Sequence, residues 1–239
     1  GTSRLSPYLR FGEISPKTIW HVSKDYSNPG TDHFVREVGW REFSYHLMAN
    51  FPFLANKPLR ENFEQFPWRD SDEDYEAWTK GMTGYPIVDA GMRELYATGW
   101  MHNRVRMIVS SFLVKHLLID WRKGERWFFD TLLDGDFCSN NAGWQWVSGG
   151  GADAAPYYRI FNPILQGKKF DTGGRYVRKW VPEIADIPNA NLHAPWELSE
   201  GQLQLFGVKL GETYPEPIVN HEFARKRALE SFDQITAKK

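Results

Sequence analysis

The chain has 239 residues, a formal net charge of -1 and 15% aromatic residues, among them eleven tryptophans. Disordered proteins are poor in aromatic residues and carry a high net charge, so this composition excludes that class. The single cysteine, Cys138, excludes a fold held together by disulfides and a zinc site built on cysteines.

No apolar run reaches the roughly 18 residues that a membrane-spanning helix needs. The N-terminal residues GTSRLSPYLR lack the apolar segment of a signal peptide, so we expect a cytoplasmic protein that does not contact a membrane. The sequence does not begin with methionine, as expected of a processed or engineered product or of a fragment of a longer chain. Its length suits one helical domain that spans residues 1–239.

Helix-forming signals recur along the chain. Ser6-Pro7 and Ser15-Pro16 each place a serine N-cap before a proline at the first helical position. Apolar residues at roughly helical spacing predict a long helix from Asp32 to Asn50. Similar signals predict further helices over residues 72–82, 86–99, 102–121, 124–133 and 216–236.

Strand signals are scarce, because few segments alternate between apolar and polar residues. From Ser139 to Asn162 the chain is rich in Gly, Asn and Ala and contains three consecutive glycines. A long irregular stretch inside a domain is usually functional. We therefore predict an all-α domain with one long loop that faces a ligand.

Two short stretches carry polar groups suited to a ligand. Residues 2–6 offer hydroxyls, a guanidinium and helix N-terminal amides, which bind phosphate, although a plain helix cap uses the same residues. Asn103, Arg104 and Met107 lie on neighbouring faces of a helix. They suit a flat polar ligand, or a helix start with solvated arginines and core methionines.

A third stretch is Asp134-Gly135-Asp136. Its two carboxylates either turn inward toward ribose hydroxyls, ring N–H groups or Arg106, or stay solvated at a helix end. The stretch lacks the rest of a calcium loop, and the histidines show no metal-binding spacing, so no metal site is predicted. The chain contains no P-loop, GxSxG or GxGxxG motif, which disfavours ordinary hydrolases and kinases.

These stretches form part of a longer ordered series of motifs. The series is TSRLSPYLRFGEISP, WREF, TGYPIVDAGMRELYATGWMHNRVRM, LLIDWRKGER, DGDFCSNNAGWQW, RIFNP and QGKKFD. From Gly1 to about Glu222 the chain resembles the flavin-binding helical domain of the DNA photolyase and cryptochrome family. The resemblance implies an all-α domain that holds FAD in a folded, U-shaped form. Full-length members also carry an N-terminal α/β domain for an antenna pigment, which we expect to lie outside this chain, so that the chain itself binds no antenna pigment.

The resemblance also implies the flavin contacts. Arg106 and Asp134 would pair beside the isoalloxazine ring, with Gly135 next to them. Asp136 would bond the polar edge of the flavin, and Asn140 would face flavin N5 and help to set the stable redox form. The segment that would hold the phosphates and the ribityl chain consists of Thr2, Ser3, Arg4, Leu5 and Ser6.

Three tryptophans match the electron relay of the family. In order from the flavin to the surface they are Trp144, Trp121 and Trp68. A relay requires easily oxidised rings that lie close enough for electron hopping. Each ring by itself is equally well explained as part of the core, and only their joint match favours the relay.

The resemblance assigns DNA contacts as well. Glu37 would hydrogen-bond a thymine of a flipped lesion, and Trp40 and Trp146 would stack on the bases. The other predicted DNA contacts are Arg41, Asn103, Arg104, Met107 and Gln166. The predicted catalytic residues are Glu37, Met107 and Asn140.

Four residues choose between branches of the family. Asn103, Met107, Asn140 and Trp146 follow the pattern of photolyases that repair cyclobutane pyrimidine dimers. Photolyases that repair (6-4) photoproducts have histidine at the first two positions, and plant-type cryptochromes usually have aspartate at the first and third. The predicted activity is therefore light-driven dimer repair in DNA by a monomer, in which excited FADH⁻ lends an electron to the dimer and recovers it after the ring opens.

Some residues depart from the family pattern and leave the subgroup open. Ala142 replaces a common glycine, Phe34 an aromatic residue that is often tryptophan, and Ser44-Tyr45 follow WREF. Two other functions remain as alternatives. One is a blue-light flavoprotein sensor without repair activity, and the other is a helical DNA-binding fragment that holds no cofactor.

Overall fold

The computed structural model describes residues 2–26, 28–154 and 157–236. Within these ranges the chain is built from helices and contains no strand, and its only bridge pairings are Arg69 with Ile119 and Leu210 with Tyr214. The all-α prediction is therefore confirmed. Among the described residues, no helix combines the length and the apolar composition required to cross a bilayer.

The helices fall into two groups along the chain. The first contains α1 (Ser6–Arg10), α2 (Pro16–Ser23), α3 (Pro29–Asn50), α4 (Asp72–Lys80), α5 (Pro86–Thr98) and α6 (Asn103–Ser111). The second contains α7 (Trp121–Thr131), α8 (Phe137–Ser148), α9 (Pro163–Phe170), α10 (Arg175–Trp180), α11 (Glu200–Leu205) and α12 (His221–Thr236). Short 3₁₀ turns η1 (Pro52–Ala55), η2 (Glu61–Gln65), η4 (Pro182–Ile184) and η5 (Pro195–Glu197) and a π-helical turn η3 (Phe112–His116) connect them.

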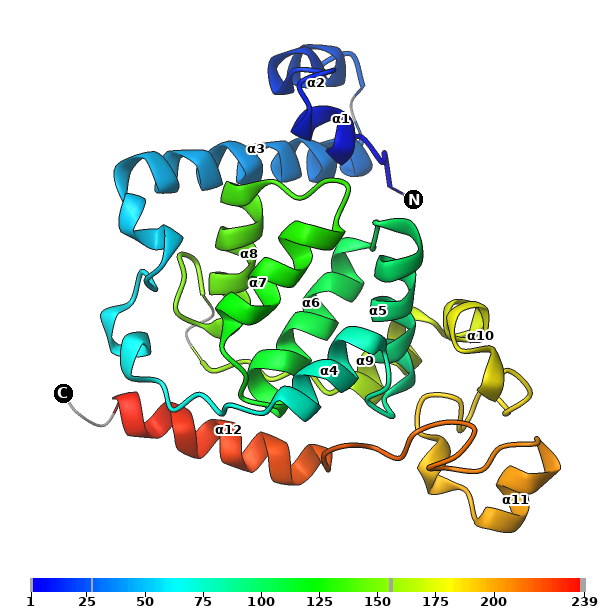
Figure 1. The fold of residues 1–239 in the computed structure, drawn as a ribbon. Coiled ribbons are helices and arrows are strands. Elements are labelled where there is room, and N and C mark those ends of the chain that lie inside the picture. Colours follow the sequence, from blue (N-terminus) through cyan, green and yellow to red (C-terminus); the bar gives the residue numbers. More distant parts are fainter. Residues whose placement is uncertain (1, 27, 155–156, 237–239) are drawn as a thin grey trace.

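Helices α5 to α8 form the centre of the molecule (Figure 1). The long helix α3 crosses one end of them and contacts α8, and α12 crosses the opposite end and contacts η3. The core between these helices contains Met92, Val109, Leu113, Phe128 and Trp144. Helices α1 and α2 stand outside this core, beyond α3.

The predicted helix over residues 102–121 is wrong in its length. Helix α6 ends at Ser111, the π-helical turn follows, and Leu118 adopts a left-handed backbone with φ of 54°. Asp120 then caps α7 by accepting a hydrogen bond from the backbone N–H of Arg122. Because residues 108–119 are all buried, their apolar side chains do not mark the break, and the prediction missed it.

The predicted loop over residues 139–162 is also partly wrong. Its first half is α8, which Asp136 caps through the backbone N–H of Ser139. Asparagine has a low helix propensity, but buried Asn141 and Gln145 both donate to the backbone oxygen of Leu54. These tertiary hydrogen bonds override the local preference. Only the segment after Gly149 is irregular, and α9, α10 and α11 were not predicted.

The boundaries of several other helices differ from the predicted ones. The long helix begins at Pro29 rather than Asp32, because the Asn28 side chain caps it. Ser15 caps α2 as predicted, whereas α1 begins at Ser6 itself with no side-chain cap. The final helix begins at His221, five residues later than predicted.

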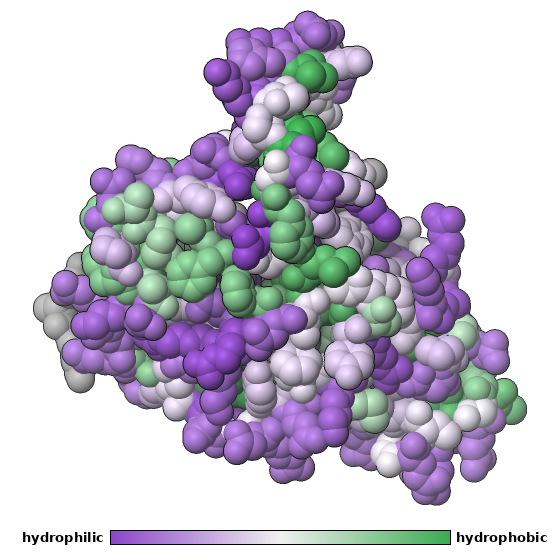
Figure 2. All heavy atoms as spheres, turned by 45° about the horizontal axis from the view of Figure 1, so that its top comes forward, coloured by the Kyte–Doolittle hydropathy of each residue, from purple (hydrophilic) through white to green (hydrophobic). Residues whose placement is uncertain are grey.

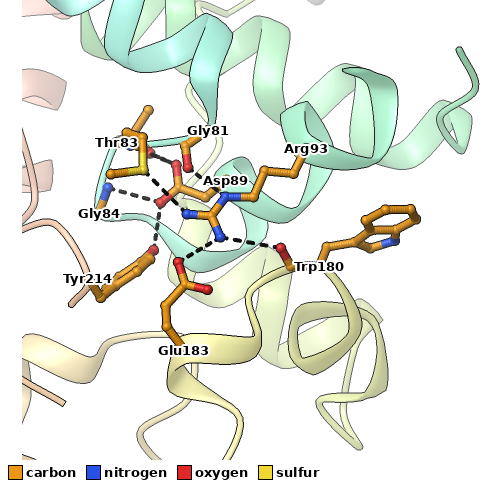
Figure 3. Close-up of polar contacts among 9 residues, drawn as sticks. Gly81, Thr83, Gly84, Asp89, Arg93, Trp180, Glu183 and Tyr214 are labelled. Carbon is orange, nitrogen blue, oxygen red and sulfur yellow. Dashed lines mark hydrogen bonds and ion pairs between the residues drawn. The ribbon is translucent and has the colours of Figure 1, made fainter. Parts of the chain in front are cut away.

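Buried Asp89 on α5 joins α5 to distant segments (Figure 3). Its carboxylate accepts hydrogen bonds from the Thr83 N–H (2.7 Å) and hydroxyl (2.6 Å), from the Gly84 N–H (3.0 Å) and from the Tyr214 hydroxyl (2.6 Å). Four donors and no acceptor suit the ionised form of the group. Burial and this carboxylate raise the pKa of Tyr214, so its hydroxyl stays protonated and donates.

Arg93, one helical turn beyond Asp89, anchors the segment that follows α10. Its guanidinium lies 2.6 Å from the Glu183 carboxylate, and it also donates to the backbone oxygens of Gly81 and Trp180 (Figure 3). Asp89 and Arg93 together therefore fasten residues 180–214 to α5.

We expect Tyr214→Phe to lower the free energy of unfolding by about 2 kcal/mol, because a hydrogen bond to a charged group contributes about 1.5–3 kcal/mol. Denaturant unfolding at neutral pH measures this change. Tyr96→Phe is the matched control, since the Tyr96 side chain is 76% exposed. Equal unfolding free energies for the two variants would contradict a stabilising role for the Tyr214 hydroxyl.

A buried histidine pair connects α12 to the π-helical turn. His116 Nε2 lies 2.8 Å from His221 Nδ1, and the His116 ring stacks on Phe112. Burial first, and then the neighbouring His221 and Arg227, lower the pKa of His116 to about 3. Burial also lowers the pKa of His221. Both rings are therefore neutral at pH 7.

Since the folded pKa values lie below the unfolded value, the folded protein binds fewer protons, and its stability falls as the pH drops below about 6.5. The loss reaches about 1.4 kcal/mol per pH unit for each histidine. We expect His116→Asn to reduce this slope by about one proton in pH-dependent unfolding experiments. His46→Asn, at an exposed position, should leave the slope unchanged, and an unchanged slope in both variants would contradict the role of the pair.

Candidate functional site

The turn between α7 and α8 gathers several of the predicted ligand contacts. Arg106 on α6 forms an ion pair with Asp134, with 2.8 Å between Nη2 and Oδ2, and its Nε donates to the backbone oxygen of Met101. The ion pair that the resemblance implied is thus formed. The other carboxylate oxygen of Asp134, Oδ1, is buried and has no hydrogen-bond partner among the described residues.

Asp136 stands at the N-terminus of α8 and contacts α3. Its Oδ1 accepts from the Ser139 N–H at 2.8 Å, and its Oδ2 accepts from the Tyr45 hydroxyl. Burial alone would raise the pKa of Asp136, but the hydrogen bonds from Tyr45 and Ser139 outweigh it and lower the pKa. Burial and this carboxylate raise the pKa of Tyr45 to about 12. Asp136 is therefore an anion held in a fixed orientation.

The N-terminal segment reaches the same turn. Arg10 Nε donates to the backbone oxygen of Gly135 at 2.7 Å, and the Arg4 guanidinium lies 4.6 Å from the centre of the Trp100 ring. Arg4 has a left-handed backbone with φ of 55°. Thr2 and Ser3 are exposed, whereas Leu5 and Ser6 are half-buried. The structure thus brings residues 2–6 to the side of the molecule that holds Asp134 and Asp136.

Asn140 is positioned by α7. Its Nδ2 donates to the backbone oxygen of Glu125 at 2.8 Å, so its amide oxygen and its second amide N–H are left for a ligand. The Glu125 carboxylate accepts from Asn141 Nδ2 at 2.8 Å, and burial raises the pKa of Glu125 to about 6. Glu125 and Tyr45 are supporting residues that the sequence analysis missed, although both lie in or directly after quoted motifs.

The three predicted relay tryptophans differ in exposure, and the one predicted to lie outermost, Trp68, is the most exposed. Trp144 and Trp121 are buried, and Trp68 is half-buried beside Phe66. The Trp144 ring packs edge-on against Trp78 at 6.2 Å. Its Nε1 is buried without a partner among the described residues. A Cβ atom at Gly124 would lie 2.2 Å from the Trp144 ring, so glycine is needed for this close approach.

The predicted DNA contacts on α3 are accessible. Glu37 is half-exposed and lies 3.5 Å from His33, and the Trp40 ring is 48% exposed with an edge contact to Phe43. Arg41 pairs with Glu42 at 2.5 Å, and its guanidinium covers the ring of Tyr45, the residue that donates to Asp136. Arg41 therefore connects the predicted DNA surface to the predicted cofactor contacts.

The remaining predicted DNA contacts lie on α6, α8 and α9. Asn103 is exposed, Met107 is half-buried, and the Arg104 guanidinium lies over Phe170 at 4.6 Å. Trp146 donates from Nε1 to the backbone oxygen of Asp153 at 3.0 Å. The side-chain oxygen of Gln166 is buried without a partner among the described residues.

The surface near these helices is partly apolar. Figure 2 shows apolar side chains gathered between the protruding N-terminal helices and the body of the molecule. Large exposed hydrophobic side chains on α3, α7, α8 and the turn between α7 and α8 are Trp40, Phe43, Phe129, Leu133 and Phe137. Flat aromatic ligands suit such a surface, because their faces bury apolar area.

The donor set favours an organic cofactor with polar edges. The unpaired Asp134 Oδ1 can accept a hydrogen bond from an N–H or O–H group of a ligand, and the Asn140 oxygen offers a second acceptor. The isoalloxazine ring of FAD combines a flat face with an N–H edge, so these residues fit it. Within the described ranges, no cluster of three or more His, Cys, Asp or Glu side chains is arranged to hold a metal ion.

Comparisons with known proteins agree with this assignment. Residues 34–234 match the sequence profile of the FAD binding domain of DNA photolyase. The chain is 57% identical to the deoxyribodipyrimidine photo-lyase of Agrobacterium fabrum over 98% of this chain and 50% of that protein. It is 42% identical to cryptochrome-1 of Arabidopsis thaliana over 98% of this chain and 36% of that protein.

A solved structure is also similar. The crystal structure of a bacterial class III photolyase from Agrobacterium tumefaciens superimposes with a TM-score of 0.94 and 54% identity, over 99% of this chain and 50% of that one. The chain thus spans about half the length of the photolyases it matches.

Proposed function

Since this chain belongs to the family of FAD-binding domains of DNA photolyases, we propose that it binds FAD and, in its full-length protein, repairs cyclobutane pyrimidine dimers in DNA by light-driven electron transfer. The observation that best supports the flavin site is the Arg106–Asp134 ion pair with its unpaired buried oxygen. We further propose that residues 1–239 act as one domain of a cytoplasmic monomer, and that an antenna pigment is held by a different part of the full-length protein.

The proposed flavin contacts divide by chemistry. The hydroxyls of Thr2, Ser3 and Ser6 and the exposed Arg4 would bind the phosphates, because they offer hydrogen-bond donors and positive charge. Asp134 Oδ1 would accept from the N–H edge of the ring, and Asn140 would approach it with its amide oxygen. Asp136 is already bonded on both oxygens, so it would act mainly through its fixed negative charge.

Repair requires the chain to hold a lesion that has left the DNA stack. Unstacking requires a few kcal/mol, and less for a base pair that damage has weakened. The exposed Trp40 ring and Trp146 would stack on the flipped bases, and Glu37 would hydrogen-bond a thymine carbonyl and stabilise negative charge on it. Arg41 and Arg104 would attract the DNA phosphates. The lesion pocket would be completed by three residues on α6 and α9, namely Asn103, Met107 and Gln166.

The cofactor, when bound and reduced, supplies the electron that opens the cyclobutane ring after excitation by light. The chain contributes orientation, a desolvated site and fixed charges. Glu125 and Tyr45 hold Asn140 and Asp136 in place. Trp144, Trp121 and Trp68 would carry electrons between the flavin site and the surface, and the greater exposure of Trp68 supports its place at the surface end.

Illumination of the reduced full-length protein with a thymine-dimer oligonucleotide tests the proposal. We expect the ultraviolet absorbance of intact thymine to recover with light and to stay unchanged in the dark. A protein with a flavin spectrum that gives no recovery would instead favour the blue-light sensor, which the similarity to cryptochrome-1 supports. A protein without any flavin spectrum would contradict both functions.

A further inference from the structure

A small cavity lies behind Trp146, between the end of α6, α8, the segment around Tyr158 and α12. It measures about 40 Å³ and is lined on its polar side by Arg60, Ser111, Lys115, Tyr158 and Arg159. A cavity needs about 10–15 Å³ to hold one water molecule, so this one has room for a few waters or one small ion. None of the roles proposed above uses Lys115, Ser111 or Tyr158.

Lys115 is buried in this cavity. Its side chain is 4% exposed, its ammonium donates to the backbone oxygen of Arg159, and it lies 4.4 Å from the centre of the Tyr158 ring. An ammonium has three N–H donors, so two remain for other partners. Nothing else in the described part of the chain accepts a hydrogen bond from this group.

Two hydroxyls beside Lys115 also lack partners. Ser111 Oγ and Tyr158 Oη are both buried, and neither has a hydrogen-bond partner among the described residues. Buried polar groups in native proteins are nearly always paired, so unpaired hydroxyls that line one cavity indicate a bound molecule or ion. All of these groups are able to donate a hydrogen bond.

The charges around the cavity have one sign. Its lining holds Arg60, Lys115 and Arg159 but no carboxylate within the described residues. Burying a charge without a partner is unfavourable, so an ammonium in such a place either loses its proton or takes up an anion. Arg60 and Arg159 raise the local positive potential, which attracts an anion and, where no anion is bound, favours loss of the Lys115 proton.

From this geometry we propose that the cavity binds a small monovalent inorganic anion of the halide class, coordinated by Lys115, Ser111 and Tyr158. These three residues line the cavity from α6, η3 and the chain at Tyr158, so an anion bound there would link these three parts. Trp146 also lines the cavity and donates to the backbone oxygen of Asp153, so a bound anion would lie in the immediate surroundings of Trp146.

Anion binding should be coupled to the protonation of Lys115. Burial first, and then Arg159, lower the pKa of Lys115 to about 7. The other charged or titratable groups near it are Arg60, Arg227, His116 and Tyr158. The lowered pKa of His116 and the raised pKa of Tyr158 keep those two neutral near pH 7. The affinity for the anion should therefore fall about tenfold per pH unit above pH 7.

Thermal unfolding of the flavin-loaded protein tests the site. We compare sodium chloride with sodium gluconate at equal ionic strength, because gluconate is too large for the cavity. Chloride should raise the midpoint temperature at pH 6, and the gain should disappear at pH 9. A crystal grown in bromide tests the site directly. The proposal would be overturned if the midpoint temperatures were equal in both salts at pH 6 and the cavity of that crystal held only water.

Three variants distinguish a loss of anion binding from a general loss of stability. Lys115→Met keeps the length of the side chain and should abolish the chloride response, and Tyr158→Phe should weaken it. Lys80→Met removes an exposed lysine and should leave the response intact. If Lys115→Met does not fold, bromide density in crystals of the unmodified protein and its loss in Tyr158→Phe decide the question. A chloride response that persists in Lys115→Met would contradict the assignment.

Discussion

Asp134→Asn is expected to lower the affinity for FAD about 10- to 100-fold, because a hydrogen bond that involves a charged group contributes about 1.5–3 kcal/mol. The substitution keeps the shape of the side chain but removes its charge. Arg106 would then face a neutral amide at 2.8 Å, and the unpaired acceptor at Oδ1 would lose its charge. Flavin content after dialysis, and flavin titration of the stripped protein, measure the effect.

Asp130→Asn is the matched control for this variant, since Asp130 lies on α7 with an exposed side chain. It should retain its flavin. A circular dichroism spectrum and an unfolding midpoint recorded without flavin separate lost binding from lost folding. Full flavin content in Asp134→Asn would rule out the proposed contact to the ring edge.

Trp144→Phe is expected to slow the photoreduction of oxidised flavin by at least an order of magnitude, because phenylalanine is much harder to oxidise than tryptophan. Repair by enzyme that is reduced beforehand should be retained, since that reaction does not use the relay. The smaller ring leaves unfilled volume in the core, so stability should fall, but no hydrogen bond of Trp144 Nε1 is lost. Transient absorption and the dimer-repair assay measure the two activities.

Trp78→Phe provides the comparison for the relay. Trp78 is equally buried and packs against Trp144, but its Nε1 donates to the backbone oxygen of Val109 at 2.9 Å. The variant should therefore lose stability and keep its rate of photoreduction. If both variants lost photoreduction and repair to the same degree, Trp144 would be a core residue without a role in electron transfer.

The site depends on contacts between distant segments. Tyr45 on α3 donates to Asp136 on α8, and Arg41 on the same face of α3 covers Tyr45. A DNA phosphate that draws Arg41 away would therefore act on the group that orients Asp136. Glu125 fixes Asn140 through its backbone and Asn141 through its side chain. Neither connection is visible in the sequence, where the partners lie 91 and 15 residues apart.

Local sequence signals were sufficient to predict the class of the fold and the positions of several helices. Caps and prolines placed α2 and α5 closely, because Ser15 and Pro86 act through neighbouring backbone groups. The ordered motifs were sufficient to identify the family, because they span almost the whole chain. The predicted ion pair between Arg106 and Asp134 also forms.

Tertiary structure decided the rest, since burial and long-range hydrogen bonds are not encoded in local periodicity. The apolar run that ends at Ile119 conceals the break at Leu118. Its residues from Ile108 onward are buried both before and after the break, so their pattern does not reveal where the helix ends. Helix α8 forms despite its asparagines, because Asn141 and Gln145 find partners on η1. The sequence by itself thus determined an all-α domain and its family. Only the packing of helices α3, α6, α7 and α8 decided which charges pair, which acceptors stay free and where Lys115 is buried.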